Sequence, residues 1–244
     1  MTGDIGNMNN KILIVLMSAY SLFAVATDNE IFVDQSGASS SIDLEQLGSG
    51  NLIGGLNATS GSMTFLDLDG STMTLDINQI GSSNKFLGDI LADTFTGFFE
   101  FTGDSNIFTI QIDPTDTYGA DDSDLQVNVT GDSNSFTLNQ ATSALASTLD
   151  LDWTINGSDN TLSFDINYDL GTSYLDLDGS DNTVNFDGSG YQGGYFYLDH
   201  TGGNRTFEIT QSSTLDSDWL KIISSGNNGT VCVIQNDAGT STSC

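Results

Sequence analysis

Residues 125–138 read LQVNVTGDSNSFTL, and this stretch decides the fold. Apolar residues alternate with polar ones up to Gly131, and after Asn134 the alternation resumes with Phe136 and Leu138. Alternation with a period of two places successive side chains on opposite faces of a strand, and Gly, Asp, Ser and Asn together are typical of a tight turn. The stretch therefore predicts two strands joined by a four-residue turn, each with one buried face and one wet face.

The same unit recurs along the chain. The turn glycines are 22 to 28 residues apart, and the last two turns keep only the glycine of the Gly-x-x-Asn pattern. A repeat of this length is typical of a solenoid rung, which buries its apolar face only against its neighbours. We expect an all-β fold, a parallel β-solenoid of about nine strand-turn-strand rungs. The turns contain Gly81 and Asn84, Gly103 and Asn106, Gly131 and Asn134, Gly157 and Asn160, Gly179 and Asn182, and then Gly202 and Gly226.

The composition supports an ordered, secreted protein with an acidic surface. Among 244 residues, 33 are Asp or Glu and four are Lys or Arg, yet 37% are apolar and 9% aromatic. Enough apolar material is present for a core, whereas disordered acidic chains usually lack it. The net charge of −29 disfavours nucleic acid and anionic membranes as partners, because both carry phosphates that need Lys or Arg.

The N-terminus has the pattern of an export signal. A short apolar run follows Lys11, and Ala24-Val25-Ala26 provides small residues for cleavage after Ala26. An uncleaved anchor or a buried strand is the alternative. We expect residues 1–26 to be an extension and signal peptide, 27–235 the solenoid, and 236–244 a tail that could cap it. Export would also allow a disulfide between Cys232 and Cys244 that closes the tail onto the last strand.

Inward amides follow a recognisable spacing. Gln or Asn side chains that face inward in a parallel stack can bond to the identical amide one rung away, which penalises a register slip; the alternative is that they lie at strand ends near solvent. Ser40-x5-Gln46-x-Gly48-x-Gly50-Asn51 resembles the curlin repeat. Related spacings occur at Asn29 and Gln35, at Gln79 before Gly81, at Asn134 and Gln140, and at Gln211 and Gln235 after the late turns.

The curlin resemblance covers most of residues 29–235 and weakens after Asn84, where bulky residues replace the small and amide residues of the family pattern. It implies export through an outer-membrane secretion machinery and self-polymerisation into a functional amyloid that supports adhesion and biofilm. The bulky core leaves two readings open. The chain is either a fibre subunit, with its N-terminal end as the growing surface, or a single folded column that serves as an adhesin.

The sequence offers no arrangement typical of a catalyst, so we expect no enzyme activity, no catalytic residue and no cofactor. His200 stands where Gln79 stands relative to the turn, which favours a core or ladder role. Paired aspartates precede glycines in two places and are expected to lie just before a turn in both. They form either a solvated acidic face or a weak Ca²⁺ site. These pairs are Asp67 with Asp69 and Asp176 with Asp178.

Overall fold

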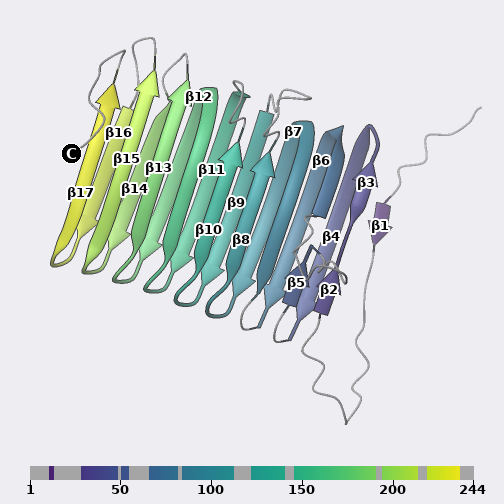
Figure 1. The fold of residues 1–244 in the computed structure, drawn as a ribbon, viewed down its shortest axis with the longest axis horizontal. Coiled ribbons are helices and arrows are strands. Elements are labelled where there is room, and N and C mark those ends of the chain that lie inside the picture. Colours follow the sequence, from purple (N-terminus) through teal and green to yellow (C-terminus); the bar gives the residue numbers. More distant parts are fainter. Residues whose placement is uncertain are drawn as a thin grey trace, which may run out of the picture.

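The chain folds as a parallel β-solenoid, as predicted (Figure 1). The computed structural model describes residues 11–13, 29–48, 51–54, 66–81, 84–112, 122–140, 146–190, 194–213 and 219–236. Every strand pair in this part of the chain is parallel. The described residues form no helix, so they include none that is long and apolar enough to cross a membrane.

The strands form two stacks that face each other. The stack before the turns contains β4 (Ser39–Leu47), the end of β6 (Leu66–Ile80), the end of β7 (Lys85–Thr102), β9 (Asp122–Thr130), β11 (Ala146–Asn156), the end of β12 (Thr161–Asp178), β14 (Tyr195–Thr201) and β16 (Trp219–Ser225). The start of β6 belongs to the stack after the turns. The stack after the turns contains β2 (Asn29–Ile31), β5 (Asn51–Ile53), the start of β7, β8 (Ile107–Ile112), β10 (Ser135–Gln140), the start of β12, β13 (Thr183–Gly190), β15 (Arg205–Ser213) and β17 (Gly229–Asn236). The short strand β3 (Asp34–Ser36) pairs with the start of β6.

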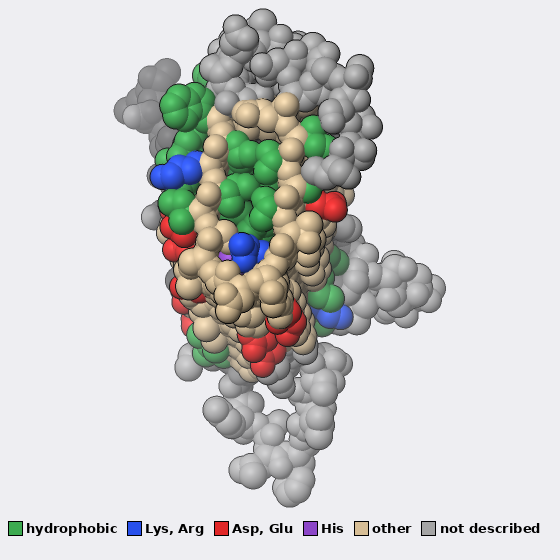
Figure 2. All heavy atoms as spheres, turned by 90° about the vertical axis from the view of Figure 1, so that its left-hand side faces the viewer, with side chains coloured by type: hydrophobic (Ala, Val, Ile, Leu, Met, Phe, Trp, Pro, Cys, Tyr) green, Lys and Arg blue, Asp and Glu red, His purple; other side chains and the backbone are tan. Residues whose placement is uncertain are grey.

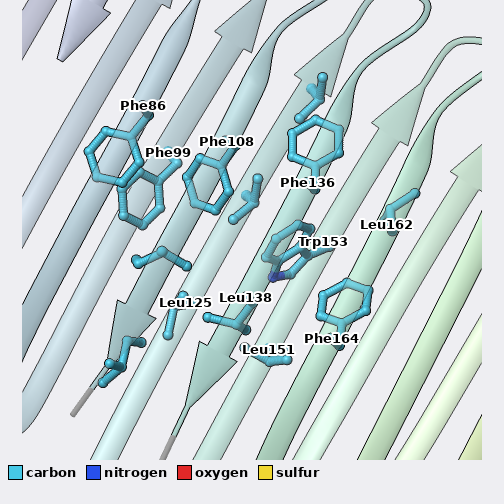
Figure 3. Close-up of a cluster of buried hydrophobic side chains, with 14 of the residues drawn as sticks. Phe86, Phe99, Phe108, Leu125, Phe136, Leu138, Leu151, Trp153, Leu162 and Phe164 are labelled. Atoms are coloured by element: carbon cyan, nitrogen blue, oxygen red, sulfur yellow. The ribbon is translucent and has the colours of Figure 1, made fainter. Parts of the chain in front are cut away.

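One apolar core fills the space between the two stacks, because the alternation of each strand turns every second side chain inward. Figure 3 shows its aromatic centre. The rings of Phe86 and Phe108 stack with their centres 5.2 Å apart. Trp153 meets Phe108, Phe136 and Phe164 edge-on, with ring centres 5.7, 5.9 and 4.9 Å apart. Equivalent positions of successive rungs therefore lie on top of one another.

Six successive turns share one backbone geometry within the described residues. In each turn the third residue adopts a left-handed conformation, with φ between 48° and 61°. Small polar residues tolerate this conformation, because their side chains can bond locally. The third residues are Ser105, Ser133, Asp159, Asp181, Asn204 and Asn228.

The prediction of a turn at Gly70 is wrong. β6 runs through Gly70, which pairs with Ala92 on β7. A Cβ atom at Gly70 would lie 1.9 Å from the carbonyl oxygen of Gly37. This glycine is therefore required by close backbone packing, and Asp67 and Asp69 lie at the start of a long strand.

The looser connection expected from one rung to the next is also absent in three places. β6, with 15 residues, and β7 and β12, with 18 residues each, continue as single strands and so belong to both stacks. The inward alternation is interrupted where each strand passes from one stack to the other. In β7 this occurs at Asp93 and Thr94, between buried Ala92 and Phe95, and in β12 near Leu170, which is 51% exposed.

The N-terminal end carries one additional strand. β1 (Lys11–Leu13) pairs in parallel with Ser41–Asp43 of β4. It falls inside the predicted signal peptide; the other residues of that peptide and its cleavage site lie outside the described residues. Figure 1 places β1 beside β4 at the end of the column opposite β17.

Candidate functional site

An asparagine ladder runs along the turns. From Asn106 to Asn182, the side-chain oxygen of each asparagine accepts a hydrogen bond from the backbone N–H of the asparagine one rung earlier. Because these groups are buried, a register shift would leave them without partners. The steps are Asn84 N to Asn106 Oδ1 at 2.9 Å, Asn106 N to Asn134 Oδ1 at 2.8 Å, Asn134 N to Asn160 Oδ1 at 3.0 Å, and Asn160 N to Asn182 Oδ1 at 2.9 Å.

These bonds differ from the predicted amide-to-amide contacts. Most asparagine amides turn back to their own rung, as Asn106 Nδ2 does to Gly103 O at 2.6 Å and Asn134 Nδ2 does to Gly131 O at 2.7 Å. Asn134 Nδ2 also reaches Asn160 Oδ1 at 2.9 Å.

A second ladder follows the outer side of the turns, and sequence reasoning missed it. The side chain at the second turn position accepts from the backbone N–H of the same position one rung later. The recurring Asp or Ser after each turn glycine was the available signal, since both side chains cap nearby N–H groups. The steps are Asp132 N to Asp104 Oδ1 at 2.9 Å, Ser158 N to Asp132 Oδ1 at 2.6 Å, Ser180 N to Ser158 Oγ at 3.0 Å, and Gly203 N to Ser180 Oγ at 3.0 Å.

The turn glycines stack with their backbones in close contact. A Cβ atom at Gly157 would lie 1.9 Å from Gly131 O, and φ at Gly157 is +155°. Both the conformation and the space thus require glycine. Gly48, Gly81, Gly103, Gly131, Gly179, Gly202 and Gly226 also have positive φ angles.

Two glutamine pairs bridge neighbouring rungs. Gln79 Nε2 donates to Gln46 Oε1 at 2.7 Å between β6 and β4. Gln235 Nε2 donates to Gln211 Oε1 at 3.4 Å between β17 and β15. The two pairs lie in different stacks and at opposite ends of the column. Asn51, which faces the first pair, donates to Gln46 O at 3.3 Å and so joins that network.

The structure does not bring Gln35 and Gln140 into these pairs. Gln35 lies beside Leu68, and its amide donates to Ser36 O at 3.1 Å. Gln140 lies between Ile112 and Ile166, and neither its amide nitrogen nor its oxygen has a hydrogen-bond partner. The sequence carried a signal for Gln140, because the residues six positions after the neighbouring turn asparagines are Ile112 and Ile166.

His200 is fully buried at the turn end of β14. Its Nε2 donates to Gly179 O at 3.1 Å, so Nδ1 of the neutral ring accepts from Ser224 Oγ at 3.1 Å. Burial lowers the pKa of His200, and the Arg205 guanidinium lowers it further, whereas the bond to Gly179 opposes the shift. The imidazole therefore stays neutral and serves as a core residue with its polar atoms satisfied.

Carboxylates crowd the outer face near the turns. Burial raises the pKa of Asp176, and Asp178, Asp199 and Asp152 raise it further by repulsion. Burial likewise raises the pKa of Asp76, with Asp43 and Glu100 adding to the effect. Neighbouring rungs thus bring like charges together with too few cations to offset them.

The two predicted aspartate pairs lie apart. Asp176 and Asp178 precede the turn at Gly179, whereas Asp67 and Asp69 pair with Asp34 and Ser36 on β3. Among the described residues no three His, Cys, Asp or Glu side chains converge as they would around a metal ion. The paired aspartates therefore do not form a common site.

We expect the protein to become more stable as the pH falls from 7 towards 4. Asp76, Asp176 and Asp187 have pKa values raised in the folded state, Asp187 by burial and then by Asp165. The folded state thus binds these protons more tightly, and the stabilisation is lost as the pH rises through the folded pKa values. Thermal melts across this range measure the effect.

Asp176→Asn should raise the melting temperature at pH 7 and reduce the gain on acidification. Asp122→Asn is the matched control, because Asp122 is exposed and lies between Thr94 and Thr148. An equal response of both variants would contradict the role of carboxylate crowding.

The cysteines fall partly outside the described region. Cys232 on β17 is disulfide-bonded rather than free. Cys244, its predicted partner, lies outside the described residues, so the pairing stays a prediction. Of the predicted tail, residues 236–244, Asn236 ends β17, and residues 237–244 lie outside the described part.

The C-terminal end of the column leaves its core open. Leu220 and Ile222 are only partly buried, although their neighbours one rung earlier, Phe196 and Leu198, are fully buried. Val231 and Val233, which also face inward, are 44% and 40% exposed. Figure 2 faces this end and shows hydrophobic side chains framed by backbone. An apolar surface between unpaired strand edges is typical of an interface.

The N-terminal end presents a similar cross-section. Ile31 and Val33 are partly buried apolar residues packed against the core. Together with Leu220 and Ile222 of the other end, they make up the partly buried hydrophobic residues that border the core. Rungs between the two ends bury the equivalent positions completely.

Comparisons with known proteins leave the chain without an assigned relative: no family model, no curated protein and no solved structure matches it.

Proposed function

We propose that the chain is a secreted structural protein, a fibre subunit that polymerises end to end at the cell surface. The observation that carries this proposal is the open C-terminal end, where inward Val231 and Val233 remain exposed and where β16 and β17 pair, among the described strands, only with β14 and β15. A column that worked alone would gain stability by covering this end with polar residues or a loop.

We also propose the number and type of the rungs, the route of export and the role of the fibre. The subunit would comprise about nine curlin-like rungs, exported through an outer-membrane secretion machinery, with adhesion and biofilm support as the role of the fibre. The parallel stack supports it, because a column with identical pairing at every step can be extended by another copy without a change of geometry. The bond from Gln79 to Gln46 lies in the region of greatest resemblance to the curlin repeat.

A concentrated preparation of the secreted protein is expected to form filaments. Their growth should show a lag phase that preformed filaments abolish, because adding a subunit to an existing end is easier than creating an end. Thioflavin fluorescence and electron microscopy measure this. A preparation that stays monomeric at high concentration would contradict the proposal.

A single observation favours a second function, that of a non-polymerising adhesin. Cys232 is disulfide-bonded on β17, the last strand, and a tail held there could cover the open end. This function predicts a monomer that begins to associate once residues 237–244 are removed. A fibre subunit would assemble with or without them.

A further inference from the structure

We propose that the C-terminal end of one subunit stacks on the N-terminal end of a second copy in the register that continues the rows within the chain, which places Lys221 beside Asp43 of the second copy. This inference rests on the proposed function and specifies its interface.

The outer row that contains Lys221 begins with a carboxylate and ends with an ammonium group. Lys221 lies beside Tyr197, with its Nζ 4.9 Å from the centre of that ring. Continuing the row by one rung brings Lys221 next to Asp43, so opposite charges meet across the joint. The row runs Asp43, Asp76, Phe98, Gln126, Asp152, Tyr174, Tyr197, Lys221.

This match stands out because cations are rare in the chain. Only four residues are Lys or Arg, against 33 Asp or Glu. Two of the four, Arg205 and Lys221, lie in the last two rungs, on β15 and β16. The N-terminal end presents Asp34 and Asp43, so the two ends attract each other while the acidic outer faces repel.

The inner rows are complementary in the same register. On the stack before the turns, Leu220 continues to Ile42 and Ile222 continues to Leu44. On the other stack, Val231 continues to Ile31. Leu220, Ile222 and Val231 at one end and Ile31 at the other are partly exposed and would thus be covered, whereas Ile42 and Leu44 are already buried in the structure that includes β1. Covering apolar surface is the main gain in such an interface.

One inner row of the other stack begins and ends with glutamine. It runs Gln35, Leu68, Ile90, Ile112, Gln140, Ile166, Gly188, Gln211, Gln235. In the proposed register Gln235 meets Gln35 of the second copy. The pair would extend the bond between Gln235 and Gln211, and a shift by one residue would place these amides on the opposite face.

The row that contains the ladder asparagines of the turns also continues across the joint between the two copies. Arg205 takes the place of the next ladder asparagine after Asn182, and Gly229 follows it. A Cβ atom at Gly229 would lie 2.5 Å from Arg205 Cγ, so the glycine leaves room for the arginine side chain. Arg205 Nε is buried without a partner in the described structure. The next residue in this row would be Asn29 of the second copy, whose amide oxygen can accept from the guanidinium.

The structure already shows a strand at this docking edge. β1 pairs with Ser41–Asp43 of β4, the segment that would receive residues 219–221 of another copy. The edge thus accepts a parallel strand in this register. β1 belongs to the predicted signal peptide, so its removal would free the edge for assembly.

Charge reversal at the two ends tests the register. Lys221→Asp and Asp43→Lys should each slow elongation from preformed filaments about tenfold or more, because each places like charges opposite one another at every joint. The double variant Asp43→Lys/Lys221→Asp restores a pair of opposite charges across the joint. It should elongate within about twofold of the unaltered protein, because the two charges have only exchanged places.

Asp122→Lys is the matched control, since it makes the same charge change on an exposed strand position away from both ends. It should leave elongation unchanged, and melting curves of all variants monitor their folding. Normal elongation of both single variants, or no recovery in the double variant, would overturn the register while leaving the fibre function standing. Failure of the unaltered protein to form filaments would overturn both.

Discussion

Replacing Trp153 by alanine is expected to lower the free energy of unfolding by about 3–5 kcal/mol, the usual cost of removing a large aromatic side chain from a core. Trp153 is 1% exposed, and its ring contacts Phe108, Phe136 and Phe164 from three different rungs. Removing the indole therefore weakens the contacts between neighbouring rungs and also reduces the buried apolar surface. Chemical denaturation followed by far-ultraviolet circular dichroism measures the change.

Trp219→Ala is the natural control, because Trp219 is the other tryptophan of the chain and is 68% exposed. It should change the free energy of unfolding by no more than about 0.5 kcal/mol, as is usual for surface positions. Similar effects of the two substitutions would show that the core is not centred on Trp153.

The substitution Gly157→Ala is expected to be nearly as damaging, although it adds a single methyl group. The backbone conformation alone costs a residue other than glycine about 1–3 kcal/mol. The new Cβ would also meet Gly131 O at 1.9 Å, which forces two rungs apart and lengthens the ladder bonds between Asn134 and Asn160. The free energy of unfolding should fall by the sum of both effects.

Gly48→Ala separates these two contributions. Gly48 has a φ of +127°, but the nearest atom to an added Cβ is Asn29 Nδ2 at 3.5 Å, an ordinary contact. This variant should therefore show only the conformational cost. If it destabilises the protein as much as Gly157→Ala does, the close packing of turn glycines contributes nothing measurable.

The fold could be predicted from the sequence because the same strand-turn-strand pattern recurs several times along the chain. Phe136 and Leu138 follow their turn at the same spacing as Phe108 and Ile110, and the structure pairs them one to one. Alternation and turn spacing are local properties, so they can be recognised in the sequence without knowledge of the tertiary structure. The parallel solenoid followed from them.

The details of the site depended on contacts between rungs, which are not local. Gln140 has the same spacing from its turn asparagine as Gln35, yet it lies between two isoleucines, because Ile112 and Ile166 stand at that same spacing in the rungs on either side. Gly70 has the sequence context of a turn, but close packing against Gly37 explains it. The opposition of Lys221 and Asp43 emerges only once every intermediate pairing is known.

The crowded carboxylates of the outer face give the proposed filament the properties of a polyelectrolyte. With the proposed number of rungs, about nine at about 4.8 Å each, a subunit would extend by roughly 43 Å, over which the chain carries a net charge of −29. The spacing of about 1.5 Å per charge is close to that of double-stranded DNA, at about 1.7 Å. Such a filament would condense counterions along its length, so its growth would accelerate with ionic strength and its surface would retain polycations.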